Sequence, residues 1–302
     1  MNLRHFLDID LIDSDTIKHL INLGHKLKKT KKNKKFLHKK ILGMIFEKPS
    51  TRTRLSFEIG MKELEGEVVV LDQNDTQLGR GESIQDTIRV MSKYVDLIMY
   101  RGFSEERLKQ IVKSSEVPII NGLTDKSHPC QIMADLMTLE EKFSSLNDLT
   151  IVWIGDGNNV CNSWIHANKH FNFKLKIATP KGYEPDKKQI RNIKNLGKSI
   201  EIYNDPFEAV DNADVLITDT WVSMGMKDEV ERKKKFKKFQ VNEKLMSYAK
   251  KNAFFLHCLP AHRGNEVSAE VINGPQSLVW EEAHNRLHVQ KAILLWCMYM
   301  DG

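Results

Sequence analysis

A short polar segment, PSTRTR, carries the residue types that bind anions. It follows the apolar run Ile41–Phe46, which has the length and flanks of a buried strand. The apolar residues after it recur near helical spacing, so Ser50 or Thr51 would cap a helix. The free N–H groups of the first turn would then face the same way as Arg52 and Thr53. This segment predicts an anion site at a strand-to-helix turn.

Short apolar runs and helical stretches alternate along the rest of the chain. This alternation predicts an α/β fold in which each parallel sheet is covered by helices. Strands are expected at 67–72, 96–101, 117–122, 149–154, 174–180, 199–205, 213–221 and 253–260, with helices at 83–94, 105–113 and 282–300.

The alternation breaks at residues 123–143, where a loop leads into a long helix. With 302 residues, the chain is long enough for two domains. We expect one domain from residues 1–140 plus 285–302 and another from 145–284, linked by interdomain helices.

Ligands of open parallel sheets bind beyond the carboxyl ends of the strands. In the first half, cations and donors fall there: Ser50, Thr51, Arg52, Thr53, Arg101, His128 and Gln131. In the second half, amides, an acid, a thiol and further polar or sulfur groups fall there: Asn158, Asn159, Asp219, Ser223, Met224, His257, Cys258 and Leu259. The first set suits an anionic electrophile, and the second suits a cationic amine.

The second half also contains sequence patterns of two other kinds of site. The stretch IGDGNNV is similar to a dinucleotide fingerprint, but the next strand ends in Thr179 where an acid should hold the ribose. The neighbours His257 and Cys258 could form a nucleophilic or metal site, yet no second ligand pair accompanies them. We therefore expect neither a nicotinamide nor a metal.

Composition limits the partners. The net charge of +6 comes mostly from the lysine-rich run Lys26–Lys40, which leaves a lysine-rich nucleic-acid-binding module as a competing class. The run contains no aromatic ladder for stacking bases, so we expect no nucleic acid. No stretch approaches the roughly 20 apolar residues of a membrane span, and the four cysteines form no C-x-x-C pair. We expect a cytoplasmic protein without a membrane partner.

Six stretches together resemble one family, the carbamoyltransferases. They are FEKPSTRTR, GESIQDTIRVMSKYVDLIMYR, HPCQIMADLMTLEE, IGDGNNVCNS, DVLITDTWVSMGM and HCLPAHRGNEV. S-T-R-T-R and H-P-x-Q mark the aspartate/ornithine carbamoyltransferase superfamily, and the last two stretches resemble its ornithine type. The resemblance covers nearly the whole chain.

The resemblance implies that carbamoyl phosphate and L-ornithine give L-citrulline and phosphate in arginine metabolism, without a cofactor. It also implies a homotrimer with active sites at subunit interfaces. A putrescine or other amine carbamoyltransferase remains the alternative, because the carbamoyl half is shared. HRGNEV departs from the family at Asn265, where an acid is usual, and QLGRGES departs at Arg80 and Gly81.

The resemblance also implies residue roles. Carbamoyl phosphate would be bound by Ser50, Thr51, Arg52, Thr53, Gln77 of a neighbouring subunit, Arg101, His128, Gln131, the Leu259 carbonyl and Arg286. Ornithine would be bound by Asn159, Asp219, Ser223, Met224 and Cys258. Catalysis would depend on Thr53, Arg101, His128 and Cys258. A cis peptide is implied before Pro260, and we expect residues 223–240 to form a loop that closes over the amino acid.

Overall fold

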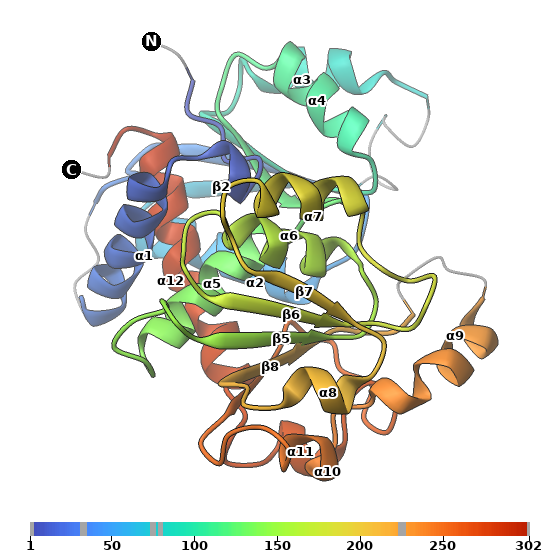
Figure 1. The fold of residues 1–302 in the computed structure, drawn as a ribbon. Helices are drawn as coiled ribbons and strands as arrows, with labels where there is room; N and C mark the ends of the chain where they lie inside the picture. Colours follow the sequence, from blue (N-terminus) through green and yellow to red (C-terminus); the bar gives the residue numbers. More distant parts are fainter. Residues whose placement is uncertain (1–2, 31–34, 73–76, 78–80, 223–227, 301–302) are drawn as a thin grey trace. The chain divides into compact units, whose positions relative to one another are not determined.

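The chain folds into two compact units, which Figure 1 shows in one ribbon view. The computed structural model describes residues 3–30, 35–72, 77, 81–222 and 228–300. The first unit runs to Met137 and resumes at His284, and the second is Thr138–Ala283. The chain passes between them within two helices, α5 (Pro129–Glu140) and α12 (Val279–Cys297).

The first unit contains a sheet of four parallel strands in the order β2-β1-β3-β4. Strand β1, one of the two inner strands, is buried along nearly its whole length, as its unbroken apolar sequence predicts. In the register of β1 with β3, Phe46 pairs with Arg101, so the two strands end at the same level. The strands are β1 (Ile41–Phe46), β2 (Glu67–Asp72), β3 (Leu97–Arg101) and β4 (Ile119–Leu123).

The remaining helices of the first unit are η1 (Ile9–Leu11), α1 (Ser14–Lys29), α2 (Thr51–Glu63), α3 (Ile84–Met91) and α4 (Glu105–Ser114). Apolar side chains of α3 and α4 pack with those of β1, β3 and β4 in one buried cluster. Helices α1 and α2 both approach α12 at glycines. A Cβ on Gly24 would lie 3.4 Å from the Cα of Val289, and one on Gly60 would lie 3.3 Å from Cγ of Lys291.

The second unit contains a sheet of five parallel strands in the order β7-β6-β5-β8-β9. Thr218 pairs with His257 where β8 and β9 end, so the residues that follow both strands start side by side. The strands are β5 (Thr150–Ile154), β6 (Lys174–Ala178), β7 (Ile200–Tyr203), β8 (Val215–Thr218) and β9 (Phe254–His257).

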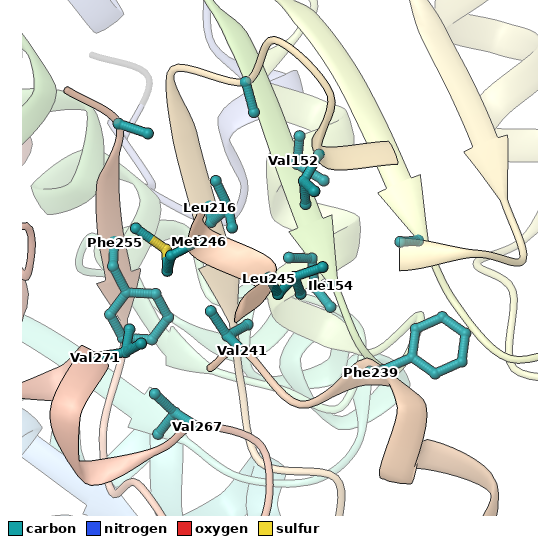
Figure 2. Close-up of a cluster of buried hydrophobic side chains, with 14 of the residues drawn as sticks. Val152, Ile154, Leu216, Phe239, Val241, Leu245, Met246, Phe255, Val267 and Val271 are labelled. Atoms are coloured by element: carbon teal, nitrogen blue, oxygen red, sulfur yellow. The ribbon is translucent and has the colours of Figure 1, made fainter. Parts of the chain in front are cut away.

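Short helices enclose the core of this unit. Figure 2 shows Val152 and Ile154 of β5 and Leu216 of β8 pointing into a cluster with Leu245 and Met246. The helices are α6 (Asn159–Ala167), α7 (Lys187–Lys194), α8 (Pro206–Val210), α9 (Glu229–Phe236), η4 (Lys237–Phe239), α10 (Glu243–Met246) and α11 (Ala269–Ile272).

Most elements follow the prediction, with two differences. The last helix begins at Val279 and ends at Cys297, about one turn before the expected range at both ends. The expected loop 223–240 lies outside the described residues at 223–227, and it is wrong in part of the rest, because Glu229–Phe236 is helical. The charged residues favour this helix, because Glu229 pairs with Lys233 and Glu231 with Lys235 one turn apart, and Phe236 at its end is buried. Across the described ranges, no helix is long and apolar enough to cross a bilayer.

Candidate active site

The polar segment after β1 begins helix α2, as predicted. Ser50 is the N-cap, and its Oγ accepts a hydrogen bond of 3.2 Å from the Thr53 amide. Thr51 is exposed, Arg52 is half-buried, and the side chain of Thr53 is buried. The first turn of a helix has unused N–H donors and a positive dipole end, so the segment can receive an anion.

Thr53 is the meeting point of two distant arginines. Its hydroxyl oxygen accepts from Nη1 of Arg101 at 3.3 Å and from Nη2 of Arg286 at 3.2 Å. Nη1 of Arg286 also donates to Oε1 of Gln131 at 2.6 Å, and Nε2 of Gln131 donates to Asp135 at 2.8 Å. Strand β3 and helices α2, α5 and α12 therefore bring these predicted residues together in the first unit.

Gln290 is a member of this cluster that the sequence reasoning missed. With its amide oxygen turned toward Arg286, Gln290 accepts from Nη2 at 2.9 Å and from Nε at 3.1 Å. Its amide nitrogen then donates to Oγ of Ser56, whose hydroxyl donates to the Arg52 carbonyl at 2.7 Å. Arg286 and Gln290 are four residues apart, and this spacing in a predicted helix could have indicated that their side chains are neighbours.

His128 is neutral near pH 7. Burial lowers its pKa well below the ordinary 6.5, and the positive charges of Arg286, Arg101 and Arg52 lower that pKa further. The side chain is only 5% exposed. A neutral imidazole in this position can donate one N–H to a carbonyl oxygen without adding a full charge.

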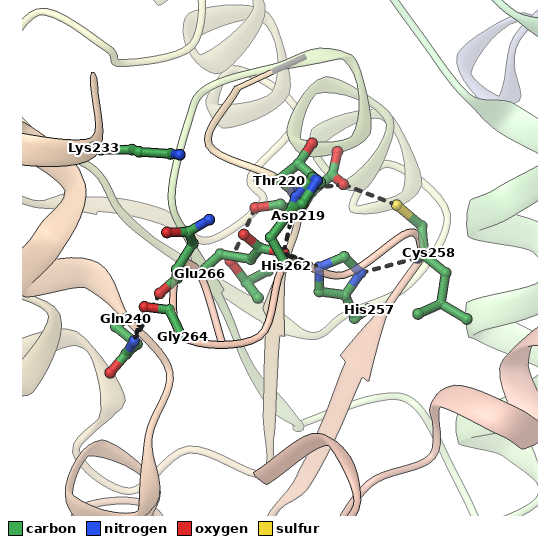
Figure 3. A network of polar contacts seen from close by, with 12 residues as sticks. Asp219, Thr220, Lys233, Gln240, His257, Cys258, His262, Gly264 and Glu266 are labelled. Carbon is green, nitrogen blue, oxygen red and sulfur yellow. Dashed lines mark hydrogen bonds and ion pairs between the residues drawn. The ribbon is translucent and has the colours of Figure 1, made fainter. Parts of the chain in front are cut away.

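Asp219 organises the polar residues of the second unit (Figure 3). Its Oδ2 accepts from Nδ2 of Asn158 at 2.8 Å, and its Oδ1 accepts from the Thr220 amide at 2.8 Å. The thiol of Cys258 donates to the same Oδ1 at 3.1 Å. Cys258 therefore acts in this cluster as a hydrogen-bond donor to the carboxylate.

Asn158 has a second contact that fixes its position. It is the N-cap of α6, and its Oδ1 accepts from the amides of Val160 and Cys161 at 3.0 and 3.1 Å. The same side chain therefore caps a helix and holds Asp219. Asn159 begins α6 directly beside it.

His257 supports the turn after β9. Its Nδ1 accepts from the Leu259 amide at 2.9 Å, so Nε2 carries the proton and faces Oε1 of Glu266 at 3.3 Å. Burial raises the pKa of Glu266, but hydrogen bonds from His257 and the His262 amide outweigh it and leave that pKa below its ordinary value. Glu266, which follows the departure at Asn265, is not among the residues predicted from the sequence.

Asp219, His257 and Cys258 are close enough together to suggest a metal site, with candidate ligand atoms within 4.8 Å of one another. Both ring nitrogens of His257 are already engaged, however, so this histidine has no lone pair to offer. The three residues fit a hydrogen-bonded cluster better than a metal centre.

The structure describes Leu259 and Gln77 among the remaining predicted site residues. The Leu259–Pro260 peptide bond is cis, as predicted. Gln77 is exposed, and its carbonyl accepts from the Glu82 amide at 3.1 Å. Ser223 and Met224 lie outside the described residues.

Two family descriptions match nearly the whole chain. Residues 4–141 match the carbamoyl-P binding domain of aspartate/ornithine carbamoyltransferase, and residues 147–297 match its Asp/Orn binding domain. The chain belongs to the aspartate/ornithine carbamoyltransferase family. The boundary between the two matches, residues 142–146, lies close to the division of the chain into two units after Met137.

Similar members of this family are known from several organisms. An ornithine carbamoyltransferase of Rhodopseudomonas palustris strain BisA53 is 52% identical over 307 residues, covering 99% of this chain and 98% of that protein. One from Nitrobacter winogradskyi is 48% identical and covers 99% and 98%. The solved ornithine carbamoyltransferase of Pyrococcus furiosus has a TM-score of 0.92 at 46% identity and covers 97% of this chain and 96% of that one.

Proposed function

We propose that this protein is an ornithine carbamoyltransferase, which transfers the carbamoyl group of carbamoyl phosphate to the side-chain amine of L-ornithine, giving L-citrulline and phosphate. The observation that carries the proposal is the similarity to relatives of that name, about half identical over nearly their full length. The contacts of Thr53 and Asp219 support it independently, because they provide an anion-binding and an amine-binding set.

The carbamoyl phosphate site is proposed at the start of α2. Ser50, Thr51, Arg52 and Thr53 would bind the phosphate through side chains and first-turn amides, with Arg101 between phosphate and carbonyl oxygen. A phosphate gains negative charge as its bond to carbon breaks, so fixed cations and N–H donors stabilise the transition state more than the substrate.

Thr53, Arg101 and His128 are proposed to polarise the carbamoyl carbonyl. Attack on the carbamoyl carbon moves negative charge onto this oxygen, and donors already aimed there need no rearrangement. The described contacts support this role, since Arg101 and Arg286 hold the Thr53 hydroxyl from two sides. Gln131, fixed by Arg286, and the Leu259 carbonyl would bind the carbamoyl amide.

Ornithine is proposed to bind through the residues of the second unit. Asp219 and Asn159, with Ser223 and Met224, would bind its amino-acid group, and the Cys258 thiol would border the reacting amine. The neutral amine forms a bond to the carbamoyl carbon and gives up one proton, which the departing phosphate takes up. The bond between that carbon and the phosphate oxygen breaks, so the phosphate leaves with the electron pair. Because only the neutral amine has a lone pair with which to attack the carbamoyl carbon, the rate should rise with pH until the bound amine is deprotonated.

Further properties belong to the same proposal. The protein would act in the cytoplasm in arginine biosynthesis, as a homotrimer in which Gln77 completes the carbamoyl phosphate site of a neighbouring subunit. The exposure of Gln77 is compatible with this role. Light scattering that gives the mass of one chain under assay conditions would contradict the trimer.

The test is a citrulline assay of the purified protein with carbamoyl phosphate, with putrescine, aspartate and N-acetylornithine offered in parallel to ornithine. We expect turnover with ornithine alone and its collapse in Arg52→Ala. Arg54→Ala is the matched control, because Arg54 lies on the same helix but is exposed and pairs with Glu58 at 2.7 Å. Product formed from another amine would leave the proposed phosphate site unchanged, but it would show that the second unit binds that amine instead of ornithine. Absence of turnover with every amine would refute carbamoyl transfer.

A further inference from the structure

Helix α12 carries a pair of histidines that the proposed reaction does not use. His284 and His288 lie four residues apart, so their side chains project from the same face one turn apart. Their Nε2 atoms are 3.2 Å apart, and their ring planes meet at 76° with centroids 4.7 Å apart. Without a further ligand, one ring must donate its Nε2–H to the other.

The separation of the two nitrogens also fits ligation of one metal ion. Zinc binds imidazole nitrogen at about 2.0–2.1 Å in tetrahedral geometry, which places two such nitrogens roughly 3.3 Å apart. Paired histidines at i and i+4 on a helix are a known arrangement for this. A metal would replace the proton that the two rings now share.

The surroundings hold one histidine in place and leave the other accessible. The side chain of His288 is only 7% exposed, so packing limits its rotamers. His284 is exposed, which gives an ion from solvent a route to the pair. The backbone between them is anchored, since Lys28 of α1 donates to Asn285 at 2.8 Å. This preorganisation lowers the entropy lost on binding.

The histidine pair and Arg286 lie on opposite faces of α12. Each helical residue advances by about 100°, so Arg286 projects about 180° away from the direction midway between His284 and His288. A bound ion would therefore not contact the Arg286 guanidinium or the Thr53 hydroxyl. It would instead bridge the turn of backbone that carries Arg286.

We propose that His284 and His288 form a two-histidine site for a divalent transition-metal ion such as Zn²⁺, with water in the remaining coordination positions. Imidazole suits zinc, nickel and copper, whereas magnesium and calcium prefer oxygen ligands. The site is separate from the carbamoyl-transfer residues, so it would stabilise the helical turn without taking part in the reaction.

The test measures Zn²⁺ binding to the full chain by equilibrium dialysis, with wild type, His284→Gln and His38→Gln compared. His38 is the matched control, because it is an exposed histidine 57% accessible at its side chain that lies outside α12. We expect His38→Gln to bind as many equivalents as wild type and His284→Gln to bind one fewer. All three proteins retain Asp219, His257 and Cys258. Any Zn²⁺ bound there therefore cancels when the equivalents bound by wild type and by His284→Gln are subtracted.

Thermal unfolding provides a second measurement, which is needed if weak surface binding of Zn²⁺ obscures the number of equivalents bound. Zn²⁺ should raise the thermal midpoint of wild type and of His38→Gln, and this shift should be smaller in His284→Gln. Far-ultraviolet circular dichroism without metal would verify that the variant is folded. Equal Zn²⁺ stoichiometry in wild type and His284→Gln, or equal thermal shifts, would overturn the site. Neither readout depends on carbamoyl transfer.

Discussion

The polar sets of the two units are assembled in different ways. In the first, residues far apart in the sequence converge on one hydroxyl, since Thr53 accepts from Arg101 and Arg286. In the second, one carboxylate, Asp219, collects donors from the loops that follow neighbouring strands. The first arrangement concentrates positive charge, and the second holds a negative charge in place.

This difference indicates where each unit is sensitive to change. Arg101 and Arg286 are buried cations whose replacement alters several contacts at once. Asp219 keeps a backbone donor and a thiol donor even if one partner is lost. We therefore expect substitutions of the cationic cluster to reduce turnover most, and substitutions around Asp219 to act mainly on the affinity for the amine substrate.

The largest effect is expected for Arg101→Gln. The change removes a cation that would stabilise both the carbonyl oxygen and the leaving phosphate, so kcat should fall by about 100- to 1,000-fold. Steady-state citrulline kinetics would measure the loss, with Arg54→Gln as the exposed control. A kcat within tenfold of wild type would remove Arg101 from the reaction.

Asp219→Asn should act on the other substrate. Loss of a charged acceptor costs about 1.5–3 kcal/mol, which corresponds to roughly a 10- to 100-fold increase in the KM for ornithine. The KM for carbamoyl phosphate should change little. Asp228→Asn, at an exposed carboxylate before α9, is the control. Equal increases in the KM values for ornithine and carbamoyl phosphate would show that the polar residues of the two units do not act on separate substrates.

Gln290→Ala tests a residue that positions Arg286 without being expected to touch substrate. Loss of its hydrogen bonds should cost on the order of 1 kcal/mol, or a several-fold reduction in kcat/KM for carbamoyl phosphate. Gln290→Asn, which retains the amide, should recover part of the activity. If the two variants were equally impaired, packing rather than the hydrogen bond would explain the loss.

His128 predicts a pH dependence of stability. Its folded-state pKa lies below the ordinary 6.5, so the unfolded chain binds more protons as the pH falls through that value. The free energy of unfolding should therefore decrease below pH 6.5, by at most about 1.4 kcal/mol per pH unit from this group. Urea denaturation between pH 7 and 5 would measure it. His128→Gln should have a shallower slope, and an unchanged slope would assign the effect elsewhere.

The smallest effect is expected at the lysine-rich run. Lys26 and Lys29 are exposed on the last turn of α1, outside the contacts described for Thr53 and Asp219. Replacing both with Gln should leave turnover within about twofold. A salt-sensitive affinity for nucleic acid that disappears in this variant would instead support the competing binding function.

Several parts of the fold could be predicted because their causes are local. The unbroken apolar run Ile41–Phe46 predicted a central strand, and the hydroxyl of Ser50 predicted the start of α2. The helix Glu229–Phe236 also has a local cause, because Glu229 and Glu231 each lie four residues before a lysine with which they pair. The burial of Phe236 and Phe239 has no such local cause, since it depends on distant segments that only the fold brings together.

The sequence by itself determined the alternation of strands and helices, and with it the placement of polar residues after the strand ends. Apolar periodicity and capping act over a few residues, so they can be read from the printed chain. Only the tertiary structure decided that Arg286 contacts Thr53, 233 residues away, and that Gln290 and Glu266 support the residues beside them. Hydrogen bonds of this kind depend on distances of a few tenths of an ångström between side chains, which packing sets and sequence spacing does not.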